Sequence, residues 1–267
     1  MFPLSGTAFP EDADELAASI RMALEEVLTF PKDSSGVTVK APQYPAVKQL
    51  TVDSDNARVK GNELPPKPAP KGKRSPGIEV GQLEISGHPG RYEKSNVDLS
   101  LTAKNVAFDF ARDKKSKPLL VLCKAGEGQV AVKVSKADMQ SLALAAASLA
   151  AKEHGVTIQE LDLTLQAKGR QTVIADARVK AKKMLVSGVL HIKGRLDIDD
   201  ELNATISELD CQGEGIIGTM AAGVIQPRLA AVNGKKIALV AFSFGDVSLR
   251  DLKIDVKNGL NVTAHFG

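Results

Sequence analysis

Hydrophobic residues recur along this chain with two different spacings. A spacing of three to four residues, typical of helices that bury one face, predicts helices over Asp12–Phe30, Lys136–His154 and Gly218–Val232. Elsewhere hydrophobic and polar residues alternate, which is typical of antiparallel strands with one face in water. The expected order is a helix, several strands, a second helix, four strands, a third helix and three closing strands. The fold class is therefore α+β and mainly β.

The strands after the second predicted helix are long and contain glycines. Their sequences are "IQELDLTLQAKG", "TVIADARVKAK", "MLVSGVLHIKGRLDID" and "LNATISELDCQG". Typical strands have about five or six residues, and interior glycines such as Gly188 and Gly194 often mark bends. Upstream, the hydrophobic residues change parity at Lys104–Asn105, which predicts a bulge. Together these features predict a long, strongly curved antiparallel sheet.

The third predicted helix is hydrophobic on most of its circumference. Between Ile216 and Val232 its single charged residue is Arg228. A helix of this kind is either buried on all sides or lies in lipid. We therefore expect the long curved strands to enclose it. The second helix has a capping-box-like start, in which Ser135 is followed three residues later by Asp138.

The segment Gly213–Gly218, "GEGIIG", matches G-x-G-x-x-G, the fingerprint of a dinucleotide-binding turn. That fold needs a buried strand before the turn, further β-α units after it and an acidic residue about 20 positions later. Here the preceding strand is amphipathic, only strands follow the helix, and the stretch "NGKK" is basic. We therefore expect no NAD. Instead, Gly213 and Gly215 should form a tight strand-to-helix turn, and Gly218 should let the helix approach another backbone.

Composition narrows the function classes further. The 267 residues are 43% hydrophobic and 25% charged, which is ordinary for a globular protein. Aromatic residues make up 4% and Trp is absent, so stacking platforms for nucleic acid are not expected. The net charge of +3 permits attraction to an anionic surface without requiring a nucleic-acid partner. No apolar run reaches the ~18 residues of a membrane span, and the N-terminal stretch is not of the secretory-signal type.

The segment Lys60–Pro76, "KGNELPPKPAPKGKRSP", breaks all periodicity. Its prolines and lysines predict a solvated loop or linker. Its basic residues could also attract an anionic membrane surface, at about 1 kcal/mol for each basic residue near such a surface. These residues are Lys67, Lys71, Lys73 and Arg74. A loop with no partner is the simpler interpretation, and the sequence favours it.

Residues with chemical reactivity form no constellation that a catalyst would need. Cys123 and Cys211 are far apart, so two free thiols are favoured while one disulfide stays open. The histidines each lack an acidic residue or Cys at ligand spacing: His88, His154, His191 and His265. Asp197–Leu202, "DIDDEL", lacks the glycine of a calcium loop and predicts a hairpin turn. We expect no metal, no cofactor, no catalytic residues and no enzymatic activity.

A family resemblance covers the chain from Gly126 to Gly267. The stretches "GEGQVAVKVSKADMQSLALAAASLAA", "VTIQELDLTLQAKG" and "GIIGTMAAGVIQPRLAAVNGKKIAL" resemble the LmeA-like phospholipid-binding family of the bacterial cell envelope. That family resembles the tubular lipid-binding (TULIP) superfamily, which includes the bactericidal/permeability-increasing protein. The resemblance implies a curved antiparallel sheet wrapped around a long helix, an apolar tunnel for acyl chains, and a location in the cell envelope or periplasm.

These observations predict one lipid-binding domain over residues 1–267, with a basic loop at 60–76. Phospholipid or another acyl-chain lipid would lie in an apolar groove between helices and sheet. The predicted lining residues are Leu24, Leu28, Leu142, Leu149, Ile217, Met220, Val224 and Leu229. Small residues would keep one side of the groove open: Gly218, Ala221, Ala222 and Gly223. The alternative is a structural or interaction protein of the same fold, with a filled core and no ligand.

Overall fold

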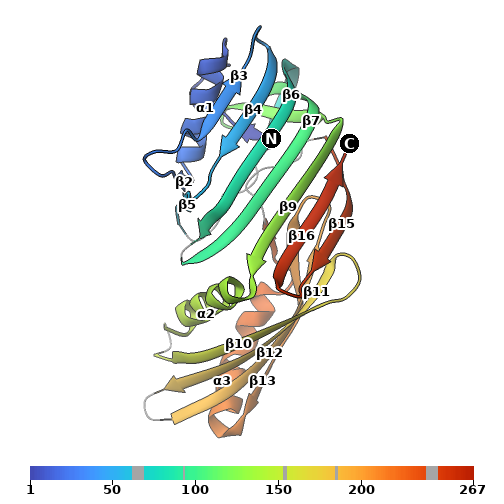
Figure 1. The fold of residues 1–267 in the computed structure, drawn as a ribbon. Coiled ribbons are helices and arrows are strands. Elements are labelled where there is room, and N and C mark those ends of the chain that lie inside the picture. The colour runs from blue at the N-terminus through green and yellow to red at the C-terminus, as the bar shows by residue number, and fades with distance from the viewer. Residues whose placement is uncertain (62–68, 93, 153–154, 184–185, 239–245) are drawn as a thin grey trace. The chain divides into compact units, whose positions relative to one another are not determined.

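The computed structural model describes residues 1–61, 69–92, 94–152, 155–183, 186–238 and 246–267 (Figure 1). Contacts divide the chain into two compact units. The first unit comprises Met1–Lys133, Val240–Leu252 and Val262–Gly267, and the second comprises Val134–Leu239 and Lys253–Asn261. The single lipid-binding domain over the whole chain stays a prediction.

The first unit is built on a mixed sheet of 11 strands, whose main order is β15-β16-β9-β7-β6-β4-β3. Neighbouring strands for which the register is described are antiparallel, except that β4 and β5 run parallel to β6. The elements of this part are β1 (Phe2–Pro3), α1 (Ala13–Glu25), β2 (Leu28–Thr29), β3 (Val37–Lys40), β4 (Ala46–Asp53), β5 (Arg58–Val59), β6 (Pro70–Tyr92), β7 (Ser95–Asp113), β8 (Pro118–Lys124), β9 (Glu127–Ser135), β15 (Leu249–Asp255) and β16 (Gly259–Phe266). The boundary between the units falls within β9, β15 and β16.

The helix α1 starts where the sequence predicts and ends earlier. The Asp12 side chain accepts the backbone N–H of Glu15 at 2.8 Å, which satisfies a donor that the helix start leaves free. Leu16 and Ile20 are buried on its inner side. The predicted end at Phe30 is wrong, because the chain turns after Glu25 and Leu28 pairs with Val59 as part of β2. Leu28 is therefore a strand residue.

The bulge that the sequence predicts at Lys104–Asn105 is wrong in position, because β6 and β7 keep their register from the pair Gln82 and Lys104 to the pair Val80 and Val106, and the register shift of β7 against β8 lies between Ala107 and Phe108. Asn105 has a φ of 51°, in the left-handed region, and both it and Lys104 are exposed. At this point β7 changes its neighbour, from β9 alongside Asp98–Lys104 to β8 alongside Ala107–Arg112. The change of hydrophobic parity therefore marks the place where one strand partner replaces another.

The predicted loop Lys60–Pro76 is wrong for its last part, which is the start of β6. Pro70 lies opposite Asp113 and Pro76 opposite Asp109, with register shifts between these two pairs and directly after the second. Proline removes a ladder donor, so it is tolerated where the ladder is already irregular. Residues 62–68, including Lys67, lie outside the described part of the chain.

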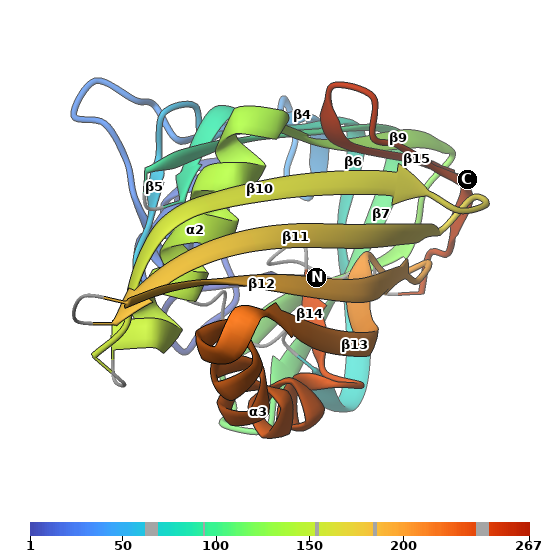
Figure 2. The same ribbon diagram turned by 90° about the horizontal axis from the view of Figure 1, so that it is seen from below.

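The second unit is a curled, fully antiparallel sheet of five strands in the order β10-β11-β12-β13-β14 (Figure 2). Its elements are α2 (Lys136–Lys152), β10 (Thr157–Ala167), β11 (Thr172–Lys183), β12 (Val186–Ile198), β13 (Asn203–Glu214), α3 (Gly215–Val232) and β14 (Lys236–Ala238). The mainly β fold and the strongly curved antiparallel sheet are confirmed. The capping-box-like start is also confirmed, because the Ser135 hydroxyl oxygen accepts the backbone N–H of Asp138 at 3.1 Å and the hydroxyl donates to the Asp138 carboxylate.

The predicted hairpin turn at Asp197–Leu202 joins β12 to β13. The carboxylate of Asp199 accepts the backbone N–H groups of Glu201 and Asn203 at 3.0 and 2.9 Å, and the Lys236 ammonium of β14 at 2.9 Å. Burial raises the pKa of Asp199, but the hydrogen bonds from Lys236, Asn203 and Glu201 outweigh it and lower this pKa from 3.8 to about 2. The carboxylate of Asp199 therefore stays ionised at neutral pH and holds the turn together.

Candidate functional site

The G-x-G-x-x-G segment forms a tight corner between β13 and α3. Gly215 has a φ of 72°, which favours glycine. A Cβ at Gly213 would overlap the backbone of Gly218 and Thr219, and a Cβ at Gly218 would lie 2.6 Å from the carbonyl oxygen of Val189 in β12. The predicted tight turn and close backbone approach are thus confirmed. Helix packing requires these glycines, and the absence of dinucleotide binding stays a prediction.

Both helices of the second unit pack on the same face of its sheet (Figure 2). The helix α2 contacts β10, and α3 contacts β13 and β12. A small buried cluster joins them to the sheet: Leu161, Val179, Leu190, Cys211 and Ala222. Partly buried residues surround this cluster, from α2 (Ala143, Leu144 and Ala147) and from α3 (Ala221, Ile225 and Leu229). The region is aliphatic throughout.

Two glutamines fix these helices to different strands of the sheet. Gln140 of α2 donates through Nε2 to the carbonyl oxygen of Leu161 in β10, at 2.6 Å. Gln226 of α3 accepts through Oε1 the backbone N–H of Cys211 in β13, at 3.1 Å. Because β11 and β12 lie between β10 and β13 in the sheet, the two anchors stand on opposite sides of the central strands.

The strand β11 carries small residues on the face that the helices share. Ala177 lies between Leu163 of β10 and Ile192 of β12, and the next row places Ala175 between Leu165 and Gly194. Residues two apart on a strand share a face, and Ala177 packs against the buried cluster. Ala175 and Ala177 therefore place small side chains on this face of β11.

A bulge in β13 fills part of this face. Glu208 has a φ of 51°, and the β12–β13 register shifts between Lys193 and Arg195. The Leu209 side chain reaches over the central strand, because a Cβ on Gly194 would lie 2.7 Å from its Cδ2 atom. Gly194 is thus a site of close packing, in keeping with an interior strand glycine.

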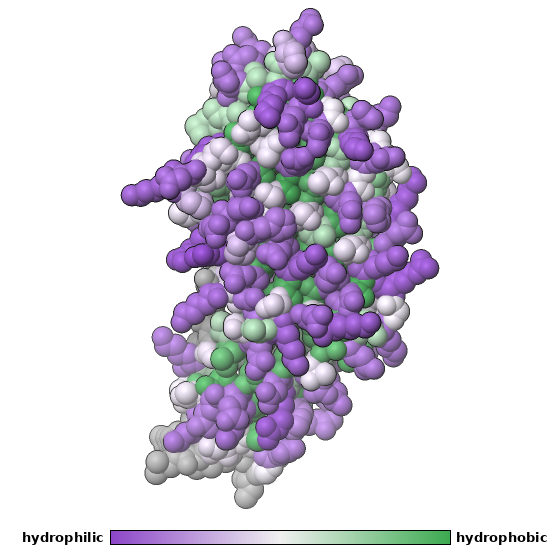
Figure 3. All heavy atoms as spheres, viewed as in Figure 1, coloured by the Kyte–Doolittle hydropathy of each residue, from purple (hydrophilic) through white to green (hydrophobic). Residues whose placement is uncertain are grey.

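The helices bury little of their apolar surface. No described side chain of α2 is fully buried. On α3 the face with Gly218 and Ala222 is buried, whereas Met220 and Val224 are 66% and 55% exposed. Hydrophobic residues also reach the surface in the region of α2 (Figure 3). An apolar helix with so much exposed surface has room for a further contact.

The structure separates the predicted lining residues into several groups. Leu142 is half-buried on α2, and Leu229 packs against the cluster. Met220 and Val224 lie on the exposed side of α3. Leu24 and Leu28 belong to the first unit and are not on this face, and the side chains of Leu149 and Ile217 lie outside the described part.

The expectation that small residues keep one side of a groove open is wrong for Gly218 and Ala222. Both are buried against the strands, because the helix start contacts the backbone of Val189. Gly223 lies in open space, on the outer side. The inner residues of α3 follow from Gly218 at helical spacing, through Ala222 and Ile225 to Leu229, and of these Ile225 was missed. A glycine that permits backbone contact therefore marks the inward face of an otherwise uniform helix.

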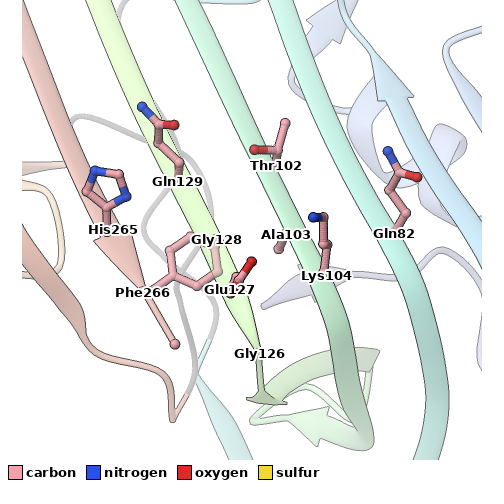
Figure 4. A pocket seen from close by; sticks show the side chains of 11 residues that line it. Gln82, Thr102, Ala103, Lys104, Gly126, Glu127, Gly128, Gln129, His265 and Phe266 are labelled. Carbon is pink, nitrogen blue, oxygen red and sulfur yellow. The ribbon is translucent and has the colours of Figure 1, made fainter.

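The first unit contains a hollow of about 450 Å³ (Figure 4). It crosses four strands and is lined by Gln82, Thr102, Lys104, Glu127, Gln129 and His265, with small residues between them. A Cβ on Gly128 would overlap the ring of Phe266, so the strands are in close contact at its base. Within the described part, its ionisable side chains form no ion pair.

Reactive groups and comparisons add no further site. Cys123 and Cys211 are free, and burial raises the pKa of both thiols, with Asp109 adding to the effect at Cys123. Where the chain is described, no group of His, Cys, Asp and Glu residues could hold a metal ion, and none of its helices meets the length and hydropathy of a membrane span. The chain matches no protein-family model, no curated protein and no solved structure.

Proposed function

We propose that the second unit binds an acyl-chain lipid, such as a phospholipid, without catalysis, on the helix-covered face of its curled sheet. The observation that carries this proposal is that α2 and α3 are anchored on either side of β11, on which Ala175 and Ala177 place small aliphatic side chains. The resemblance of Gly126–Gly267 to the LmeA-like family points the same way.

The chemistry of the lining suits an acyl chain. Side chains on α2 and on the sheet face are aliphatic, with no ring for stacking a flat ligand. Burying a methylene group contributes about 0.8 kcal/mol, so ten methylenes would contribute about 8 kcal/mol before the ordering of the chain is subtracted. Partial exposure of Leu142, Leu144 and Ala147 leaves apolar surface that such a chain would cover.

A specific observation also favours the alternative, an interaction protein with a filled core. Leu209 already lies over Gly194, and five buried residues join the helices to the sheet. In that case the remaining surface of α2 and α3 would be covered by a protein partner. The two proposals differ in whether space for a ligand exists above Ala177.

The test combines extraction with a filling variant. Lipid extracted from the purified protein is identified by mass spectrometry, and uptake of a fluorescent phospholipid is titrated. Ala177→Phe should lower uptake at least tenfold and leave the free energy of unfolding nearly unchanged, because the ring enters free space. The matched control, Ala137→Phe at an exposed position of α2, should leave both unchanged.

Absence of extractable lipid and of uptake by the wild type contradicts the lipid proposal. If Ala177→Phe also destabilises the fold by about 1–3 kcal/mol, as overpacking does, the core is filled and the alternative is correct.

A further inference from the structure

Two lysine-rich segments that are distant in sequence meet on adjacent strands of the first unit. Lys71 at the start of β6 lies opposite Arg112 of β7, and Arg112 lies opposite Pro118 of β8. The β7–β8 hairpin, "DKKSK", follows directly after Arg112. This pairing creates a surface that we name the basic patch, consisting of Lys71, Lys73, Arg74, Arg112, Lys114, Lys115 and Lys117.

The hairpin side of the basic patch is held by hydrogen bonds. Asp113 accepts through Oδ1 the backbone N–H groups of Lys115 and Lys117, at 2.7 and 2.8 Å. Arg112 donates through Nη1 to the carbonyl oxygens of Ser116 and Thr7, at 2.8 and 2.9 Å. The backbone that carries these lysines is therefore fixed, while the lysine side chains are exposed.

Positive charge exceeds negative charge on the basic patch. Arg74 pairs with Asp246, Lys117 pairs with Glu26 at 3.5 Å, and Asp113 lies within the hairpin. Seven basic and three acidic side chains give a local formal charge of +4, which is larger than the +3 of the whole chain. Four lysines are exposed and form no ion pair with any described residue: Lys71, Lys73, Lys114 and Lys115.

We infer that the basic patch binds the surface of an anionic phospholipid bilayer. Lysine carries a compact charge on a flexible stem, which suits attraction to a diffuse anionic surface, whereas arginine is used for bidentate recognition of single phosphates. Five of the seven basic residues are lysines. This inference goes beyond lipid uptake by the second unit, because the residues are different and the ligand is a membrane surface.

The test is cosedimentation of the full chain with vesicles of phosphatidylcholine alone or mixed with phosphatidylglycerol, at low salt and at 0.5 M salt. Two variants reverse charge on the two segments separately, Lys71→Glu/Lys73→Glu and Lys114→Glu/Lys115→Glu. Each lysine near an anionic surface changes affinity about fivefold, so each variant should lose at least about 25-fold.

The matched control is Lys48→Glu/Lys124→Glu, which applies the same charge change to exposed lysines of the same unit. Lys48 lies beside Gly81 of β6, eight residues from Lys73, or about 25 Å at the rise of a strand. That distance exceeds the screening length at physiological salt, so binding by the control should change less than fivefold.

Three results would overturn the inference: equal binding to neutral and anionic vesicles, equal losses in the patch variants and the control, or tighter binding to duplex DNA than to anionic vesicles at the same salt. Lipid uptake by the second unit is measured separately with the same variants. If the wild-type protein takes up no lipid, the proposed function is overturned. The vesicle experiment still tests the basic patch in that case, because it does not depend on lipid uptake.

Discussion

Both units consist of one or more helices packed on a sheet, but their hydrophobic side chains are buried to different degrees. Of the 12 largest fully buried side chains among the described residues, ten lie in the first unit, and the second contributes Ile198 and Leu202. Four of the five large hydrophobic residues that are most exposed belong to the second unit: Met220, Val224, Val232 and Ile237. The first unit therefore has the larger core, and the second exposes more of its large hydrophobic side chains.

The helices show the origin of this difference. In α1 the hydrophobic residues form one stripe, which is buried as Leu16, Ile20 and Ala23, and charged residues occupy the other side. In α3 hydrophobic residues occur all round, and a single sheet face covers only one side of a helix. A sequence that makes a helix apolar on every side thus leaves part of it available for another contact.

The largest expected effect on the free energy of unfolding comes from a cavity in the core of the first unit. Phe108→Ala should lower the free energy of unfolding by about 3–5 kcal/mol, because a ring that is 1% exposed leaves a cavity in the first unit. Leu144→Ala on the half-buried α2 should lower it by about 1 kcal/mol or less. Urea unfolding of both variants measures these free energies. Equal losses of stability would contradict the difference in packing between the two units.

The corner before α3 is one of the closely packed places in the second unit. Gly218→Ala should destabilise the protein by about 1–3 kcal/mol, because the new Cβ would lie 2.6 Å from the carbonyl oxygen of Val189. Gly223→Ala is the control on the same helix, where nothing lies within 4 Å, and should stabilise by up to about 1 kcal/mol. Thermal unfolding of both variants measures the change in stability. A change of the same sign in both would show that the corner is not closely packed.

The Asp199 turn should make part of the stability depend on pH. Its pKa is lowered to about 2, so its contribution is present above the unfolded value of 3.8 and is lost as the pH falls toward 2. The side chain is 36% exposed, and after allowance for solvent screening we expect Asp199→Asn to lose about 1 kcal/mol at pH 7. The difference from wild type should shrink between pH 4 and pH 2, and a constant difference would exclude a charge effect.

The smallest effect is expected on the outer side of α3. Met220→Gln should change the free energy of unfolding by less than about 0.5 kcal/mol, because this side chain is 66% exposed. The measurement is made with and without added phospholipid. A loss above about 1.5 kcal/mol without lipid would show that the outer side of α3 is buried in solution.

Local patterns predicted much of the fold. Alternation located the long strands of the second unit, the parity change at Asn105 located an irregular position in β7, and the acidic run around Asp199 located a turn. Each of these features depends on residues that are close in sequence. The glycine corner at Gly213–Gly218 could also be assigned, since a single close approach requires those residues.

Features that depend on distant partners could not be predicted. Leu28 continues the hydrophobic stripe of α1, yet pairing with Val59 makes it a strand residue. Pro70 joins a strand because β7 lies beside it. The inward face of α3 was assigned correctly only at Leu229, since a helix that is apolar all round has no stripe, and contacts of Gly218 with Val189 and of Gln226 with Cys211 orient it. The place of the small residues on β11 likewise depends on sheet register.

The boundary between the units has a consequence for synthesis of the chain. The first unit includes Val262–Gly267, and β16 lies between β9 and β15 in its sheet. One of the two strands beside β9, β16, is therefore synthesised only after nearly all of the second unit. Folding cannot proceed strictly from the N-terminus, and a fragment that stops at Lys133 would present β9 as an open edge prone to aggregation.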